Sequence, residues 1–288
     1  MSPPQIVNRR LYALRRARAP GTDFLVRDAA ARLAERVTTV NRRFDCALDL
    51  SSRDEGFAEL CGGAEQWTRT TLSARAGTVP ADEEALPFAP GSFDLITSVL
   101  SLHAVNDLPG ALIQIRRALK PDGLFMAALF GGETLSELRD AFAAAESEIS
   151  GGVSPRVLPC TDIRDAGALL QRAGFALSVA DVERTQVRYR VFSTLIRDLR
   201  ALGETNALEQ RSRKFLRRDV LAAALAQYAD RHAELDGRLR ATFDIVYLTG
   251  WAPHKDQQQP LAPGSARARL ADALQANESS VGRGGKAD

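Results

Sequence analysis

The sequence predicts an α/β fold built on a doubly wound sheet, and three observations carry this prediction. Segments typical of strands and of helices alternate over the first 175 residues. Residues 93–125 have the pattern of one strand–helix–strand unit, which implies two parallel strands joined by a right-handed crossover. The chain has 288 residues, of which 45% are hydrophobic and 26% charged, enough for one large core or two small ones.

The unit at 93–125 is the most regular part of the pattern. Phe93 to Leu100 is rich in apolar residues that favour strands, which suits a strand buried on both faces. Asp107 is a capping acid with a proline in the following turn, so a helix is predicted to start there. Pro121-Asp122-Gly123 ends that helix with a turn, and Leu124 to Phe130 is predicted as the next strand.

Further elements are predicted on both sides of this unit. Residues 44–50 are an apolar run that ends in an acid, and they are the candidate first strand. Thr134 and Glu137 have the spacing of a capping box for a helix that ends near residue 149. The other predictions are a helix at 55–61, strands at 66–72 and 76–81, a helix at 162–173, a strand at 175–191, helices at 192–202 and 216–232, and a strand at 242–251.

The chain is predicted to have three parts. Residues 1–40 form a basic helical lead-in, residues 41–274 form the main domain with a helical insertion at 192–238, and the polar, glycine-rich residues 275–288 form a disordered tail. The first 22 residues hold five arginines and no acid, which is also typical of a cleaved mitochondrial transit sequence. The amphipathic continuation from Asp23 to Val37 favours the helical lead-in.

Composition excludes several classes of function. The formal charge of +2, from 38 basic and 36 acidic residues, argues against a dedicated nucleic-acid binder. Cys46, Cys61 and Cys160 are an odd, unpatterned set, which fits a reducing compartment better than disulfides or a metal site. No run approaches the roughly 18 apolar residues of a transmembrane helix.

Several motifs together resemble the class I S-adenosylmethionine-dependent methyltransferases. They are Asp49 at the end of the first strand, Leu86-Pro87-Phe88, Phe93-Asp94-Leu95, and the stretch from Leu112 to Gly123 that ends in Leu119-Lys120-Pro121-Asp122-Gly123. This resemblance implies a Rossmann-like sheet of seven strands with S-adenosylmethionine as the cofactor.

One branch of that family is more similar. The segments that carry this likeness are Ser101-Leu102-His103, Val105-Asn106-Asp107, the stretch from Phe130 to Leu135, and Gly250-Trp251-Ala252-Pro253. The branch holds the malonyl-acyl-carrier methyltransferase and the methyltransferase-like assembly factor of respiratory complex I. The resemblance implies a protein or acyl-carrier substrate, with a complex I subunit among the candidates, in the bacterial cytoplasm or alternatively the mitochondrial matrix. Because the assembly factor is associated with arginine hydroxylation, the fold need not mean methyl transfer.

The loop after the first strand departs from the family pattern. The resemblance assigns Asp49, Leu50 and Ser51 to cofactor binding, but Ser51, Arg53 and Glu55 stand where the family has glycines. Side chains at such positions cost about 1–3 kcal/mol each if the backbone must be left-handed. A working cofactor loop and a decayed one are both compatible with this stretch.

The acids available to a cofactor are the second point of comparison. The zone from Thr68 to Ser73, where a ribose-binding acid is expected, contains neither Asp nor Glu, and a threonine hydroxyl is a weaker partner. Asp82 and Glu83 match the adenine-binding turn of the family and are predicted cofactor contacts. A solvated acidic turn is the alternative.

His103 is the candidate catalytic residue. It follows the predicted strand, near whose end Ser98 is assigned to the cofactor, and a histidine can act as a base near neutral pH. A structural histidine is the alternative. Ala104 stands where the family has a tryptophan, which would widen or empty part of the pocket. No metal site is predicted.

Two functional hypotheses follow. The first is an S-adenosylmethionine-dependent enzyme that modifies a protein or a carrier-bound group, with arginine hydroxylation as a variant. The second is an assembly or binding protein that kept the fold and lost the cofactor. The basic clusters at 9–18 and 211–218 are solvated helix faces by default, or contacts for an acidic protein surface. A nucleotide-dependent oxidoreductase is disfavoured, because no GxGxxG follows the first strand.

Overall fold

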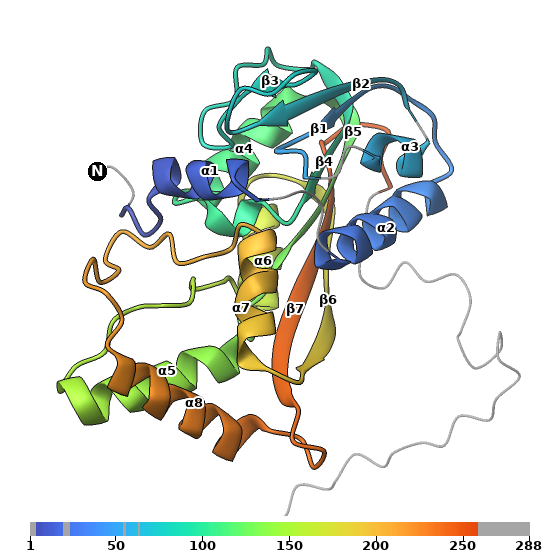
Figure 1. Cartoon of the computed structure of the whole chain (residues 1–288). Helices are drawn as coiled ribbons and strands as arrows, with labels where there is room; N and C mark the ends of the chain where they lie inside the picture. The colour runs from blue at the N-terminus through green and yellow to red at the C-terminus, as the bar shows by residue number, and fades with distance from the viewer. Residues whose placement is uncertain (1–3, 20–23, 54–55, 63, 259–288) are drawn as a thin grey trace, which may run out of the picture. The chain divides into compact units, whose positions relative to one another are not determined.

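The computed structural model describes residues 4–19, 24–53, 56–62 and 64–258 (Figure 1). By their contacts the residues group into two compact units, residues 1–254 and 255–288. Every helix and strand of the described residues lies in the first unit. The predicted tail at 275–288 lies outside the described residues.

A seven-stranded sheet organises the first unit, as predicted. Its strand order is β3-β2-β1-β4-β5-β7-β6. The five strands from β3 to β5 run parallel, whereas β7 is antiparallel to both of its neighbours. The strands are β1 Phe44–Asp49, β2 Ala64–Thr71, β3 Val79–Pro80, β4 Phe93–Val99, β5 Leu119–Phe130, β6 Ala176–Tyr189 and β7 Leu239–Trp251.

Helices cover both faces of this sheet. They are α1 Arg9–Ala17, α2 Phe24–Thr39, α3 Phe57–Cys61, η1 Leu102–Ala104, α4 Leu108–Ala118, α5 Ser136–Ser150, α6 Ile163–Arg172, α7 Phe192–Ala201 and α8 Arg218–His232. One hydrophobic core contains buried residues of α2, α3, α5, α7 and α8, and a second contains those of α4 and α6. The predicted insertion forms α7 and α8, and α8 packs beside α5 (Figure 1).

The predicted strand–helix–strand unit is confirmed as β4, α4 and β5. All seven residues of β4 are buried, as expected for a central strand with helices on both faces. Asp107 caps α4, and its Oδ1 accepts a hydrogen bond from the Gly110 amide at 2.8 Å. β5 begins at Leu119, earlier than predicted, because the residue pairs with Phe93 before the Pro121-Asp122-Gly123 turn, and the register shifts across that turn.

The predicted capping box of α5 is wrong. The helix begins after Leu135, which has a left-handed backbone (φ +54°) and makes no side-chain cap. Thr134 Oγ1 instead donates to the Asp244 carbonyl at 3.1 Å and accepts from the Asp244 amide at 3.2 Å. The Glu137 carboxylate accepts from the amide and the hydroxyl of Thr242, at 3.1 and 2.5 Å. Both side chains therefore tie α5 to β7, and tertiary contacts replace the local cap.

Candidate active site

The loop after β1 holds Ser51 in a left-handed conformation with φ +57°. Its amide donates to Thr70 Oγ1 at 2.8 Å, so the threonine hydroxyl proposed for a ribose is already engaged. Ser51 occupies the first of the family's glycine positions, and its backbone adopts the conformation that glycine accepts without cost. Arg53 is not among the residues with positive φ, and Glu55 lies outside the described residues.

Glu83 is fully buried beside this loop. Its Oε1 accepts from Ser51 Oγ at 2.6 Å and from the Ser101 hydroxyl, and its other oxygen pairs with the Arg9 guanidinium. Burial raises the Glu83 pKa, but Arg9 and the two hydroxyls outweigh burial and lower it below its ordinary value. Glu83 is thus an ionised carboxylate whose oxygens are occupied by the chain's own donors.

Helix α1 supplies the cation for this acidic turn. Arg9 also donates to Asp82 Oδ1 at 2.7 Å and to the Ala104 carbonyl at 3.0 Å. Asn106 Oδ1 accepts from the amides of Ile6 and Val7, both at 2.8 Å, and so holds the chain that leads into α1. In Figure 1 α1 accordingly lies beside the loop that leads into α4.

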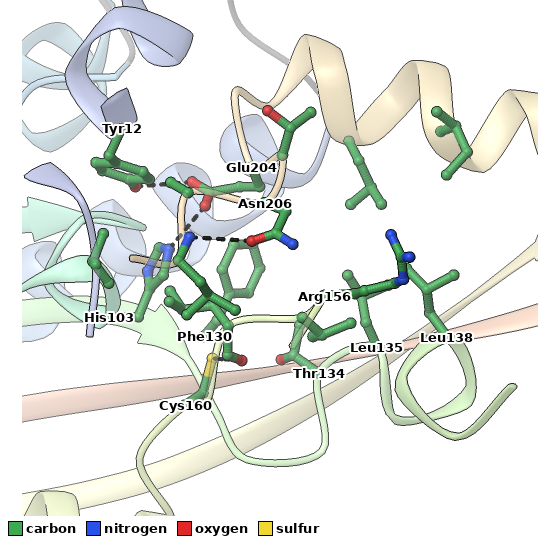
Figure 2. Close-up of a pocket in the computed structure, with 18 of the residues that line it drawn as sticks. Tyr12, His103, Phe130, Thr134, Leu135, Leu138, Arg156, Cys160, Glu204 and Asn206 are labelled. Carbon is green, nitrogen blue, oxygen red and sulfur yellow. Dashed lines mark hydrogen bonds and ion pairs between the residues drawn. The ribbon is translucent and has the colours of Figure 1, made fainter. Parts of the chain in front are cut away.

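Glu204, which follows α7, is the centre of a second polar cluster. Its Oε1 accepts from Arg53 at 2.8 Å. Oε1 also accepts from the Tyr12 hydroxyl at 3.0 Å, and Oε2 lies 3.2 Å from His103 Nε2 (Figure 2). Burial raises the Glu204 pKa, but His103 and Arg53 outweigh burial and lower it to about 2. Three segments far apart in sequence therefore meet on one carboxylate.

His103 is buried between aromatic rings. Its ring centroid lies 4.7 Å from that of Phe130 and 6.4 Å from that of Tyr12. Because Nε2 faces the Glu204 carboxylate, the neutral ring carries its proton on Nε2. Nδ1 is buried and has no hydrogen-bond partner among the described residues. This is the pairing of base and orienting acid that a general base needs.

A cavity of about 360 Å³ opens beside this pair. Its walls are mostly apolar, and its polar groups include Glu204, Asn206 and Arg156. Residues that line it include Tyr12, His103, Phe130, Thr134, Leu135, Leu138, Phe142, Cys160, Leu199 and Phe243 (Figure 2). An apolar cavity with a few convergent polar groups has the character of a small-molecule or side-chain site.

The structure brings together only some of the predicted site residues. Ser51, Asp82 and Glu83 meet around Arg9 and Ser101, and His103 lies at the cavity. Asp49 and Leu50 are buried at the end of β1. Ser98 is buried within β4, and its Oγ has no hydrogen-bond partner among the described residues.

Sequence reasoning missed Arg9, Tyr12 and Glu204. Arg9, Tyr12 and Arg16 share one face of α1 by their spacing of three and four, and this was the available signal. Nothing in the sequence joins Glu204 to His103, which lies 101 positions away. The predicted widening at Ala104 is not seen, because Val7 and Tyr12 pack against that residue in a small third core.

S-adenosylmethionine fits this arrangement only in part. The carboxylates expected to receive its adenine are present, but Arg9 holds both of them. Arg53 reaches the carbonyls of Leu100, at 2.8 Å, and Leu202 across the predicted cofactor loop. In this structure, therefore, arginines of the chain itself occupy the hydrogen-bond acceptors that a cofactor would need.

Comparisons with known proteins place the fold and the family. The family profile described as "Methyltransferase domain" matches residues 21–127. The YcgJ protein of Bacillus subtilis has a solved structure that aligns with a TM-score of 0.54 at 13% identity, covering 77% of this chain and 98% of that one, which shows the fold alone. The arginine hydroxylase NDUFAF5 of Danio rerio is 41% identical over 263 residues, which are 87% of this chain and 82% of the relative.

The chain belongs to the methyltransferase-fold family that includes NDUFAF5. The human NDUFAF5 is 40% identical over 268 residues, covering 88% of this chain and 77% of the relative. A malonyl-[acyl-carrier protein] O-methyltransferase of Laribacter hongkongensis is 40% identical over 194 residues, covering 67% of this chain and 63% of the relative. S-adenosylmethionine is the cofactor that this family implies, and the predicted resemblance to both kinds of protein is confirmed.

No helix among the described residues is long and apolar enough to cross a membrane. The described residues also contain no cluster of three or more His, Cys, Asp or Glu side chains arranged to hold a metal ion.

Proposed function

We propose that the protein is an S-adenosylmethionine-dependent enzyme that modifies a group carried by a protein or an acyl carrier. The observation that carries this proposal is the His103–Glu204 pair at the cavity. When bound, the cofactor supplies an electrophilic methyl group. The chain's own part is to admit the substrate group to the cavity and, where that group must lose a proton, to accept the proton at His103.

The names of the relatives support this substrate class. One is named for acting on malonyl-acyl carrier protein, and others are named as mitochondrial arginine hydroxylases. The free cysteines of this chain favour a reducing compartment, and we infer the bacterial cytoplasm or the mitochondrial matrix. A complex I subunit is a candidate partner because the sequence resembles the assembly factor of that complex.

Calorimetric titration with S-adenosylmethionine and S-adenosylhomocysteine tests the cofactor. We expect binding, and we expect Asp82→Ala to weaken it about tenfold, the value of one charge-assisted hydrogen bond. Unchanged affinity in the variant would remove Asp82 from the site. No heat and no thermal shift at millimolar ligand would overturn the enzyme proposal.

Labelled methyl transfer to a protein acceptor that must lose a proton, such as an arginine side chain, tests the base, because the carboxylate of a malonyl group is already ionised at neutral pH. Replacing a general base typically costs a factor of 10²–10⁴, so we expect His103→Asn to lower the rate at least a hundredfold. His254→Asn is the control, and its rate should match that of the wild type. Equal rates in both variants would assign His103 a structural role.

Two alternatives have their own support. A cofactor-free assembly protein is favoured by the internal engagement of Glu83 and Glu204. Arginine modification is favoured because Glu204 already holds a guanidinium, that of Arg53. Binding of S-adenosylhomocysteine would contradict the first alternative. The group added to the acceptor, a methyl group or an oxygen atom, would decide between methyl transfer and arginine hydroxylation.

A further inference from the structure

The loop between α7 and α8 presents an exposed aromatic ring among cations. Phe215 is fully exposed at 100%, and Leu216 beside it is 37% exposed. Arg211, Arg213, Lys214, Arg217 and Arg218 surround them in sequence, and we call residues 211–218 the basic loop. Phe215 and Leu216 together give the loop apolar surface among charges, and aromatic side chains are enriched at protein interfaces.

The charge of the basic loop is poorly compensated. Glu209 lies 3.8 Å from Arg213, at the edge of ion-pair distance, and Asp219 pairs with Arg217 where both side chains are about half exposed. These two acids face five cations, so the loop carries a local excess of positive charge. Exposed pairs of this kind contribute little to stability, which leaves the charge available to an external partner.

The basic loop borders the cavity through one residue. Leu216 itself lines the cavity, as do Arg156 and Arg200. The Ser212 amide donates to Ser154 Oγ at 3.1 Å, which holds the loop beside the segment that leads to Arg156. In that segment Val153 is 60% exposed and adds to the apolar surface. A macromolecule bound to the loop would therefore have the cavity within reach.

We propose that the basic loop is the docking surface for an acidic protein, whose modified group enters the cavity at His103. Phe215 is the apolar anchor, and the cations steer the partner and set its orientation. This inference rests on the proposed function, because it names the chemistry of the partner that carries the substrate. A single-stranded nucleic acid is disfavoured, since the loop offers one aromatic residue and no series of stacking rings.

The test uses the full chain and malonyl-acyl carrier protein as the acidic probe, measured by surface plasmon resonance at low and physiological salt. We expect the triple variant Arg213→Glu, Lys214→Glu, Arg217→Glu to bind at least tenfold more weakly, mainly through slower association. Phe215→Ala should bind about fivefold more weakly through faster dissociation, with the salt dependence of the wild type. The matched control is Arg164→Glu, Arg172→Glu, Arg188→Glu on exposed positions of α6 and β6, and it should bind within twofold of the wild type.

Three results would overturn this inference. They are no binding of the probe at low salt, equal loss in the triple variant and the control, and capture of the protein by vesicles with 30% phosphatidylserine but not by the probe. S-adenosylhomocysteine titration of the same variants separates the two proposals. Variants that still bind S-adenosylhomocysteine but no longer bind the probe would support the docking role of the basic loop. A wild type that binds the probe but not S-adenosylhomocysteine would refute only the cofactor proposal.

Discussion

Glu204 is the residue on which the candidate site depends most. Its side chain is 12% exposed, and it receives Arg53, Tyr12 and His103. A buried cation left without its carboxylate costs more than the pair contributed, because desolvation is no longer offset. The residue therefore links the stability of the fold to the orientation of the candidate base.

Glu204→Gln should lower the free energy of unfolding by about 3 kcal/mol at pH 7, the cost of breaking a buried ion pair. The folded-state pKa of about 2 lies below the ordinary value of 4.5. The carboxylate therefore stabilises the fold fully above pH 4.5, and its contribution is lost as the pH falls from 4.5 to 2. Urea unfolding at several pH values should show the wild type and the variant converging over that range. Glu148→Gln, on an exposed position of α5, should match the wild type throughout.

Restoring glycine at Ser51 and Arg53 should strengthen S-adenosylhomocysteine binding several-fold. The first change relieves a left-handed serine, a strain of about 1 kcal/mol, and the second removes the guanidinium that crosses the loop. Calorimetry of the single and double variants measures the effect. Weaker binding would mean that the present loop is adapted to its ligand and that Arg53 helps to hold it.

At the scale of single elements, the sequence predicted features that depend on local patterns and missed those that depend on contacts between distant residues. The start of α4 was predictable because its cap is local: the Asp107 side chain accepts from the amide of Gly110, three residues later, and needs no tertiary partner. The pairing of Thr134 and Glu137 with β7 was not, since their acceptors and donors lie 105 to 110 positions away. The Arg9–Glu83 pair was missed for the same reason, with 74 positions between the partners.

Glu137→Ala should destabilise the protein by about 2 kcal/mol, because it leaves the buried amide and hydroxyl of Thr242 without their charged acceptor. Chemical unfolding measures the loss. Glu148→Ala on the same helix removes an exposed carboxylate and should cost less than 0.5 kcal/mol by the usual range for surface sites. Equal losses would indicate that helix propensity, and not the tie to β7, explains the effect.

At the scale of the whole molecule, the sequence predicted the sheet and the family better than the state of the site. The sheet was predictable from the alternation of strands and helices and from the family resemblance, whereas the arrangement of the site depends on α1 and the insertion meeting through Tyr12 and Glu204. Asp82 and Glu83 were correctly placed in one turn, but their engagement by Arg9 has no signature in the sequence.

Binding of S-adenosylmethionine should raise the melting temperature of the whole chain. A ligand at one hundred times its dissociation constant stabilises the folded state by about 2.7 kcal/mol, which is roughly 4–5 °C for a chain of this size. Scanning fluorimetry over a ligand series checks the concentration dependence. A melting temperature that does not change with ligand would contradict binding to the folded state.

The shared carboxylate of Glu204 has a thermodynamic consequence. Arg53 belongs to the predicted cofactor loop, and His103 lines the cavity, so a ligand that draws Arg53 away from Glu204 would change the charge that the cavity presents. By thermodynamic linkage, if the first ligand changes the affinity for the second by some factor, the second changes the affinity for the first by the same factor. The two ligands of this enzyme are therefore expected to bind cooperatively, with the partner protein tightening or loosening the hold on the nucleoside by the same amount that the nucleoside affects the partner.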